Sequence, residues 1–170
     1  AEIQNINLSQ KVSDEIMSEI YQALLDYQVI FFRDQKFDPA SQKIFAEKIG
    51  KPIVYPFVKG LEDFPEITPI LKKETDINNF GGIWHSDTTY QENPPMGTML
   101  YALETPQFGG DTEFANQYLA YERLSDGMRK FLDTLEGVNI SGKSRVAKTR
   151  SDIMKHASVG LKGDELTAIH

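Results

Sequence analysis

The chain has 170 residues, 40% of them apolar, which is enough to fill the core of one domain. Acidic residues outnumber basic ones by 25 to 18, giving a net charge of −7, and no cluster of Lys and Arg could follow a phosphate backbone. No apolar run approaches the roughly 18 residues of a membrane-spanning helix. The composition therefore predicts a single globular domain with neither a nucleic acid nor a membrane as partner.

The lack of cysteine narrows the possible chemistry. Without a thiol, disulfides, thiolate nucleophiles and iron–sulfur clusters are excluded, and His, Asp and Glu remain as the strong metal ligands. The first five residues carry neither the basic nor the apolar segment of a secretory signal. We therefore expect a cytoplasmic protein, and its three histidines are the natural starting point for a metal site.

Spacing and capping residues predict two helices in the first third of the chain. Residues 13–27 place apolar side chains on one face behind a serine N-cap. The β-branched and aromatic run at 29–32 favours a buried strand. Asp38 and Pro39 then begin a second helix, which ends at Gly50.

The middle of the chain reads as strands and loops, followed by further helices. Prolines are frequent between residues 51 and 69, so this segment can form loops or edge strands but no long helix. Residues 98–103 and 111–115 resemble two strands joined by a Pro and Gly turn, which predicts an antiparallel pair. Helices are expected at 116–124 and at 125–137.

One histidine lies in an informative context. His85 and Asp87 are two residues apart, and on an extended strand this spacing puts both side chains on the same face. Imidazole and carboxylate could then converge on one metal ion, as two of the three protein ligands of a non-haem Fe(II) site do. From the tripeptide alone, a hydrogen-bonded core histidine beside a turn-capping aspartate is the favoured interpretation.

Three ordered blocks around this pair resemble a known family. They are NFGGIWHSDTTY at residues 79–90, PPMGTMLY at 94–101 and GGDTEFAN at 109–116. Together they are similar to the taurine/phenoxyacetate dioxygenases, which depend on Fe(II) and 2-oxoglutarate. The similarity extends from the first helix to about residue 135, and the three blocks in order are far more specific than any one of them.

Carried over residue by residue, the resemblance implies roles for three side chains. His85 and Asp87 match two iron ligands, and Thr112 matches the threonine that donates a hydrogen bond to the distal carboxylate of 2-oxoglutarate. The implied cofactors are Fe(II), 2-oxoglutarate as cosubstrate and O₂. The implied reaction hydroxylates a small organic substrate and releases succinate and CO₂. Taken alone, Thr112 would be an ordinary strand threonine.

Two further residues are candidates for substrate binding. Tyr55 occupies the place of a histidine that helps many family members to bind an anionic substrate group. A phenol donates one hydrogen bond but carries no positive charge at neutral pH, so this departure argues against taurine itself. Asn79 could shape the mouth of the cavity, although a plain loop explains it equally well.

The resemblance also implies the fold. It is an α+β fold with a double-stranded β-helix (jelly-roll) core and flanking helices, of which residues 1–170 would form the N-terminal part as a single domain. The family's third iron ligand, a histidine, and the arginine that pairs with 2-oxoglutarate lie beyond the position of His170. We therefore expect this chain to lack the C-terminal strands and to be inactive alone, with His156 and His170 away from the site. The basic segment 141–160 is predicted to be a mobile loop.

Two other functions compete with the dioxygenase. A non-catalytic protein could keep this fold and bind an organic acid. A hydrolytic Zn²⁺ site on His85 and Asp87 is a third hypothesis, weakened because no further His or Glu follows at a recognised zinc spacing. The sequence allows a homo-oligomer but does not decide the oligomeric state.

Overall fold

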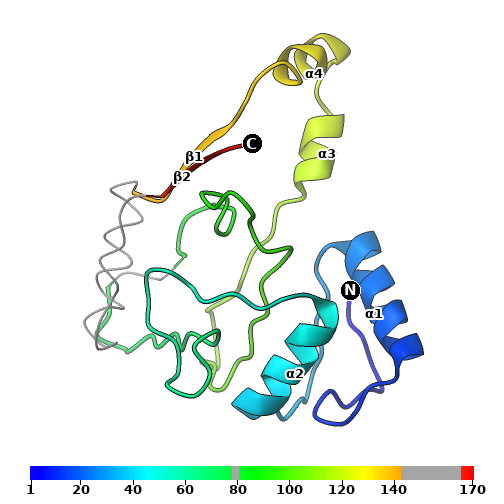
Figure 1. The fold of residues 1–170 in the computed structure, drawn as a ribbon, viewed down its shortest axis with the longest axis vertical. Coiled ribbons are helices and arrows are strands. Elements are labelled where there is room, and N and C mark those ends of the chain that lie inside the picture. The colour runs from blue at the N-terminus through cyan, green and yellow to red at the C-terminus, as the bar shows by residue number, and fades with distance from the viewer. Residues whose placement is uncertain (78–80, 143–165) are drawn as a thin grey trace.

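The structure is a computed structural model that describes residues 1–77, 81–142 and 166–170. Asn79, His156 and nearly all of the segment 141–160 lie outside the described residues. The elements in chain order are α1 (Asp14–Tyr27), α2 (Pro39–Ile49), α3 (Gln117–Glu122), α4 (Asp126–Leu132), β1 (Val138–Ile140) and β2 (Thr167–Ile169) (Figure 1). None of the described helices is both long and apolar enough to cross a membrane.

Helix α1 begins and ends where local chemistry predicts. The Ser13 hydroxyl accepts a hydrogen bond from the backbone N–H of Ile16, which satisfies one of the free donors of the first turn. At the other end Gln28 adopts a left-handed conformation with φ 63° and donates its N–H to the Leu24 carbonyl. The predicted helix at residues 13–27 is confirmed.

Helix α2 has a complete capping box. The Asp38 carboxylate accepts from the Ser41 N–H at 2.7 Å, while the Ser41 hydroxyl accepts from the Asp38 N–H at 3.1 Å. Pro39 occupies the first turn, where its missing N–H costs nothing. The predicted start at Asp38 and end at Gly50 are both confirmed.

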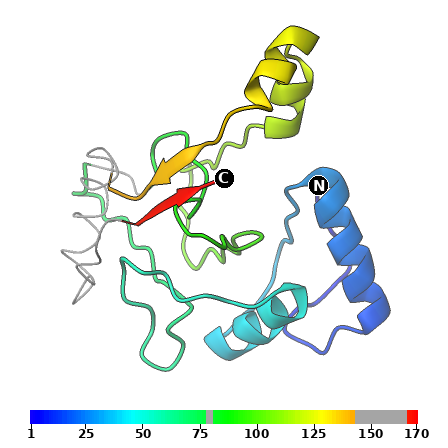
Figure 2. The same ribbon diagram turned by 45° about the horizontal axis from the view of Figure 1, so that its top comes forward.

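The core lies between α1 and α2 and the N-terminal segment that passes beneath them (Figure 2). Its buried members are apolar side chains from both helices and from residues 6–12, and Met99 packs against them from far along the chain. The buried residues of this cluster are Leu8, Val12, Met17, Ile20 and Phe45. The main apolar core therefore lies in the N-terminal part of the chain, and the segment around Met99 packs against it.

The prediction of a buried strand at residues 29–32 is wrong. Phe31 forms only an isolated parallel bridge with Glu2 and is 42% exposed. Gln28 and Asp34 have φ angles of 63° and 55°, so left-handed residues turn the chain on both sides of this stretch. The extended stretch is therefore too short to pair as a regular strand.

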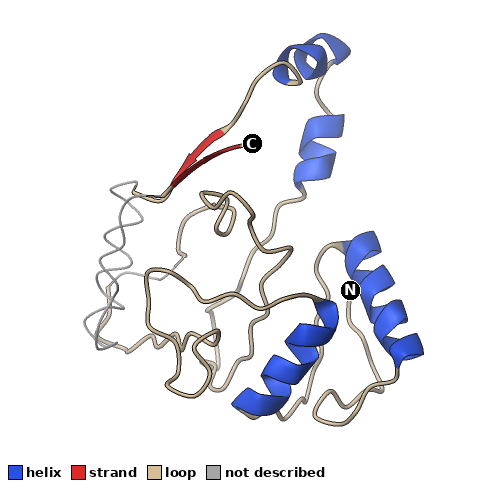
Figure 3. Cartoon of the chain, viewed as in Figure 1, coloured by secondary structure: helices blue, strands red, loops and turns tan. Residues whose placement is uncertain are grey.

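The antiparallel pair expected at residues 98–103 and 111–115 is not present. Both segments run as irregular chain in the region between the α1–α2 pair and β1–β2 (Figure 3). A strand exists only when a neighbour satisfies its backbone groups. Within the described residues neither segment is paired in a sheet. Their apolar side chains are correspondingly exposed, Leu100 by 68% and Phe114 by 64%.

The last part of the described chain forms α3, α4 and a small sheet. Helix α3 confirms the prediction at 116–124, but α4 ends at Leu132, so the helix expected to reach residue 137 is shorter. After Leu132 the backbone forms i→i+3 bonds, from the Thr134 N–H to the Phe131 carbonyl and from the Leu135 N–H to the Leu132 carbonyl, and the Thr134 hydroxyl also donates to the Phe131 carbonyl. Strands β1 and β2 are antiparallel and pair Asn139 with Ala168.

Candidate functional site

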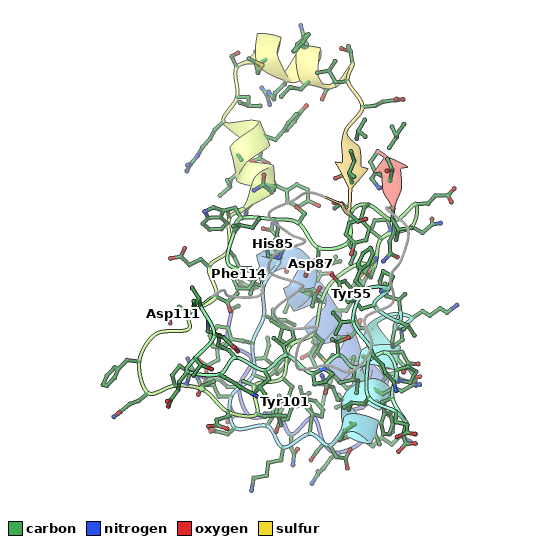
Figure 4. All side chains as sticks on the ribbon, turned by 90° about the vertical axis from the view of Figure 1, so that its left-hand side faces the viewer. Tyr55, His85, Asp87, Tyr101, Asp111 and Phe114 are labelled. Atoms are coloured by element: carbon green, nitrogen blue, oxygen red, sulfur yellow. The ribbon has the colours of Figure 1, made fainter. Side chains whose placement is uncertain are left out.

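The structure brings His85 and Asp87 into direct contact. His85 Nε2 lies 3.1 Å from Asp87 Oδ1, and the two side chains are 44% and 52% exposed (Figure 4). The i, i+2 spacing therefore places them on one side of the chain, as the sequence predicts. Because both are about half exposed, the described residues do not enclose them in a cavity.

A backbone carbonyl fixes the tautomer of His85. Its Nδ1 lies 2.6 Å from the carbonyl oxygen of Ile83, and a carbonyl can only accept a hydrogen bond. Nδ1 therefore carries the hydrogen, and in the neutral imidazole the lone pair of Nε2 points toward Asp87. Metal-binding histidines are oriented in this way, by a hydrogen bond from the other ring nitrogen.

The pair fits an octahedral metal ion. With metal–ligand distances of about 2.1 Å and a right angle at the metal, two neighbouring ligand atoms lie about 3.0 Å apart. The 3.1 Å between Nε2 and Oδ1 is close to this value. An imidazole and a carboxylate are also the mixed donor set that non-haem Fe(II) prefers. The same distance suits an ion pair when His85 is protonated, so metal binding has to be tested directly.

Two unusual backbone positions flank the pair. Gly81 has φ 71°, and a Cβ added there would lie 3.2 Å from Cε1 of His85, so a side chain at this position would press on the imidazole. Thr88 follows Asp87 with φ 52°, which a β-branched residue rarely adopts. The positive φ angles of Gly81 and Thr88 constrain the backbone on both sides of the pair, and the placement of His85 and Asp87 depends on that backbone conformation.

The second oxygen of Asp87 has a partner that the sequence analysis missed. The Thr98 hydroxyl donates to Asp87 Oδ2 at 2.7 Å. Thr98 lies within the PPMGTMLY block, but nothing in that block distinguishes its hydroxyl from that of any other exposed threonine. The Ile83 carbonyl was missed because a backbone group leaves no mark in a sequence.

The other predicted site residues make no hydrogen bond with the pair. Thr112 is exposed, and among the described residues it makes no hydrogen bond with His85 or Asp87. In the view of Figure 4 Asp111 lies to the left of the pair and Tyr55 to its right. The ring of Tyr55 packs edge-on against Phe57 at 5.8 Å.

An aromatic series connects Tyr55 to the chain that follows Asp87. Phe57 is buried between Tyr55 and Tyr90, with centroid distances of 5.8 and 5.6 Å. Tyr90 is only three residues beyond Asp87. Tyr55 is thus connected to the chain just after Asp87 through ring packing by way of Phe57.

His170 lies closer to the pair than expected. Its Nε2 is 2.9 Å from the carbonyl oxygen of Thr89 and 3.2 Å from that of Gln91. Because both partners are acceptors, Nε2 carries the hydrogen that it donates to them. Within the described residues His170 joins no group of three possible metal ligands, and its hydrogen bonds hold the turn that follows Asp87.

No third ligand joins the pair within residues 1–77, 81–142 and 166–170. In that part of the chain no three His, Asp or Glu side chains are grouped so that they could hold a metal ion. His85 and Asp87 could thus offer at most two protein ligands from this part of the chain.

Comparison with known proteins identifies the family. Residues 1–162 match the model of the taurine catabolism dioxygenase TauD, TfdA family. This chain belongs to that family. The resemblance inferred from the three sequence blocks is therefore confirmed, and the match to the TauD/TfdA family covers residues 1–162 of this chain.

Relatives of this TauD/TfdA-family chain include characterised and solved proteins. It is 33% identical over 142 residues to an alkylsulfatase of Acinetobacter baylyi, covering 82% of this chain and 43% of the relative. It is 32% identical over 154 residues to an alpha-ketoglutarate-dependent sulfate ester dioxygenase of Pseudomonas putida, covering 90% and 50%. A crystal structure of a taurine dioxygenase from Burkholderia xenovorans superposes with a TM-score of 0.65 at 31% identity, covering 81% and 48%. The chain thus spans about half the length of these relatives.

Proposed function

We propose that this chain forms the iron-binding part of an Fe(II)- and 2-oxoglutarate-dependent dioxygenase that hydroxylates a small organic anion. The observation that carries the proposal is the contact between His85 Nε2 and Asp87 Oδ1 at 3.1 Å, with Nδ1 held by the Ile83 carbonyl. Family membership favours this function over a non-catalytic acid-binding protein and over a zinc hydrolase.

Three side chains of the chain have a defined task in this proposal. His85 and Asp87 would hold Fe(II), and Thr112 would donate a hydrogen bond to the distal carboxylate of 2-oxoglutarate. Bound Fe(II) supplies, with 2-oxoglutarate and O₂, the oxidising chemistry that hydroxylates a C–H bond and yields succinate and CO₂. The protein fixes the ligand atoms in advance, because the Ile83 carbonyl and the Thr98 hydroxyl orient them before the metal binds.

The substrate is proposed to be anionic. Relatives are named for sulfate esters, sulfonates and 2,4-dichlorophenoxyacetate, all of which carry a negative charge at neutral pH. Tyr55 would offer its hydroxyl to that anionic group from the aromatic series beside the pair. Asn79 is kept as a second candidate contact, although it lies outside the described residues.

The complete site is proposed to need a jelly-roll core. The segments at 98–103 and 111–115 have strand-like sequences with exposed apolar side chains, and they would become strands when further strands pair with them. The third ligand and the arginine for 2-oxoglutarate are proposed to lie in the part of the family's length that this chain does not span. We therefore expect residues 1–170 alone to form no succinate.

Anaerobic addition of Fe(II) and 2-oxoglutarate to the intact protein tests the proposal. Chelation of Fe(II) by 2-oxoglutarate at this site produces a visible charge-transfer band, and admission of O₂ then yields succinate. An acid-binding protein would bind 2-oxoglutarate without the band, and a zinc hydrolase would form neither the band nor succinate with Fe(II), 2-oxoglutarate and O₂. Absence of the band in a protein that is saturated with Fe(II) would rule out the dioxygenase.

A further inference from the structure

The two oxygens of the Asp87 carboxylate have separate partners. Oδ1 faces His85 Nε2 at 3.1 Å, and Oδ2 accepts the hydroxyl hydrogen of Thr98 at 2.7 Å. The hydrogen bond to a charged acceptor is short, which is typical of the stronger class of hydrogen bond. The carboxylate is therefore restrained from rotating about its terminal bond, and one defined oxygen is presented beside the imidazole.

The separate partners of the two Asp87 oxygens matter because a carboxylate can bind a metal through one oxygen or through both. An octahedral ion offers six positions. Three protein ligands, two oxygens of 2-oxoglutarate and O₂ would use all of them. A second oxygen from Asp87 would compete with the cosubstrate or with O₂. A donor that occupies Oδ2 favours single-oxygen coordination and keeps the sixth position open.

The backbone around Thr98 is anchored to the N-terminal core. Met99 packs against the α1–α2 cluster, and the Tyr101 hydroxyl donates to the Gln35 carbonyl at 3.1 Å. Met99 and Tyr101 thus face the core, whereas Thr98 reaches Asp87, an alternation typical of extended backbone. Figure 4 shows Tyr101 low in the molecule, beside α2, and the His85–Asp87 pair above it. The position of the Thr98 hydroxyl is therefore set by the contacts of Met99 and Tyr101 with the core, and not by the residues of the candidate metal site.

We propose that Thr98 is a positioning residue that holds Asp87 in single-oxygen coordination, with Oδ1 directed to the metal beside His85. The inference rests on the proposed function. It concerns a hydroxyl that touches neither the metal nor the substrate, and it acts only through the orientation of Asp87. Removal of the hydroxyl should therefore change the affinity and the geometry of the metal without unfolding the protein.

Anaerobic Co(II) titration of the intact protein tests the inference, with Co(II) as a spectroscopic probe of the Fe(II) site. We expect Thr98→Val, which keeps the shape of the side chain, to raise the dissociation constant for Co(II) by about tenfold, as other losses of a ligand-orienting partner do. The visible Co(II) bands should shift as well, because coordination changes when Oδ2 is released. Thr98→Ser should restore both the affinity and the bands, since it keeps the hydroxyl.

Thr105→Val is the matched control, because it makes the same substitution at an exposed threonine of the same irregular segment. It should leave Co(II) binding and the bands unchanged, and urea denaturation should show Thr98→Val folded to the same extent. A wild-type affinity and spectrum in Thr98→Val would overturn the role of Thr98 while leaving the iron site intact. If the wild-type protein binds no Co(II) in a manner that depends on His85, the proposed function fails, and this inference fails with it.

Discussion

The Tyr101 hydroxyl donates a hydrogen bond of 3.1 Å to the backbone carbonyl of Gln35, 66 residues earlier in the chain. Gln35 itself binds the N-terminal segment, because its side chain accepts from the Leu8 N–H at 2.8 Å and donates to the Ile6 carbonyl at 3.0 Å. The ring of Tyr101 also packs edge-on against Phe37 at 5.5 Å. These contacts connect the segment that carries Thr98 to the core.

Tyr101→Phe should lower the free energy of unfolding by about 0.5–1.5 kcal/mol, because it removes one hydrogen bond but keeps the ring. Urea denaturation measures this loss. Phe37 would retain its aromatic partner, so a loss well above this range would mean that the hydroxyl has partners beyond Gln35. An unchanged midpoint would show that Tyr101 contributes through its ring alone.

His85→Ala and Asp87→Ala should each abolish Fe(II)-dependent succinate formation by the intact protein, because each removes a metal ligand. Succinate assay and Fe(II) titration measure the effect. His170→Gln serves as the control, since glutamine can still donate to the Thr89 and Gln91 carbonyls. Near-normal turnover in either alanine variant would disprove the ligand assignment.

Gly81→Ala should weaken metal binding. The alanine Cβ would lie 3.2 Å from Cε1 of His85, and φ 71° is unfavourable for any residue with a side chain. Both effects displace the imidazole, so we expect a higher dissociation constant for Co(II). Gly97→Ala is a matched control, because a Cβ there meets nothing within 4 Å. Equal Co(II) binding by the two variants would show that Gly81 does not support His85.

Thr112→Val should weaken 2-oxoglutarate binding while Fe(II) binding is largely kept. The change is nearly isosteric and removes one hydrogen bond to a charged group, worth roughly 1.5–3 kcal/mol. This corresponds to a loss of affinity of roughly ten- to a hundredfold. Anaerobic titration with 2-oxoglutarate measures it, and an unchanged dissociation constant would leave Thr112 without a role in the site.

The ion pair between Lys43 and Glu66 should make stability depend on pH in the acid range. Lys43 Nζ lies 2.8 Å from Glu66 Oε1, with side chains 30% and 19% exposed. The hydrogen bond from Lys43 holds the pKa of Glu66 below its usual value. The stabilisation is therefore complete above the unfolded-state pKa, about 4.3, and is lost as the pH falls through the lower folded-state pKa.

Lys43→Gln should accordingly reduce stability at pH 7 and flatten its decline between about pH 5 and pH 3. Urea denaturation across this range measures the slope. Lys48→Gln is the matched control on the same helix, because its partner Asp14 is 95% exposed and the pair is screened by water. If the free energy of unfolding falls equally steeply with decreasing pH in the wild type and in Lys43→Gln, this pair does not cause the loss of stability at acid pH.

The limits of α1 and α2 and the closeness of His85 to Asp87 were predictable from the sequence because they follow local rules. The caps of α1 and α2 involve residues within three or four positions of one another, and backbone geometry alone determines which side chains can reach which N–H groups. His85 and Asp87 are likewise close because of their i, i+2 spacing. Family membership was also predictable, since three motifs in order carry far more information than one tripeptide.

Only the tertiary structure decided what surrounds these local features. The strands expected at 29–32, 98–103 and 111–115 depend on partners elsewhere in the chain, and their sequences do not reveal whether a neighbour is present to pair with them. The Ile83 carbonyl that fixes His85 and the Thr98 hydroxyl that holds Asp87 depend on where the folded backbone passes. Residue types and spacing thus brought the two candidate ligands together, whereas the course of the folded backbone set the orientation of each candidate ligand atom.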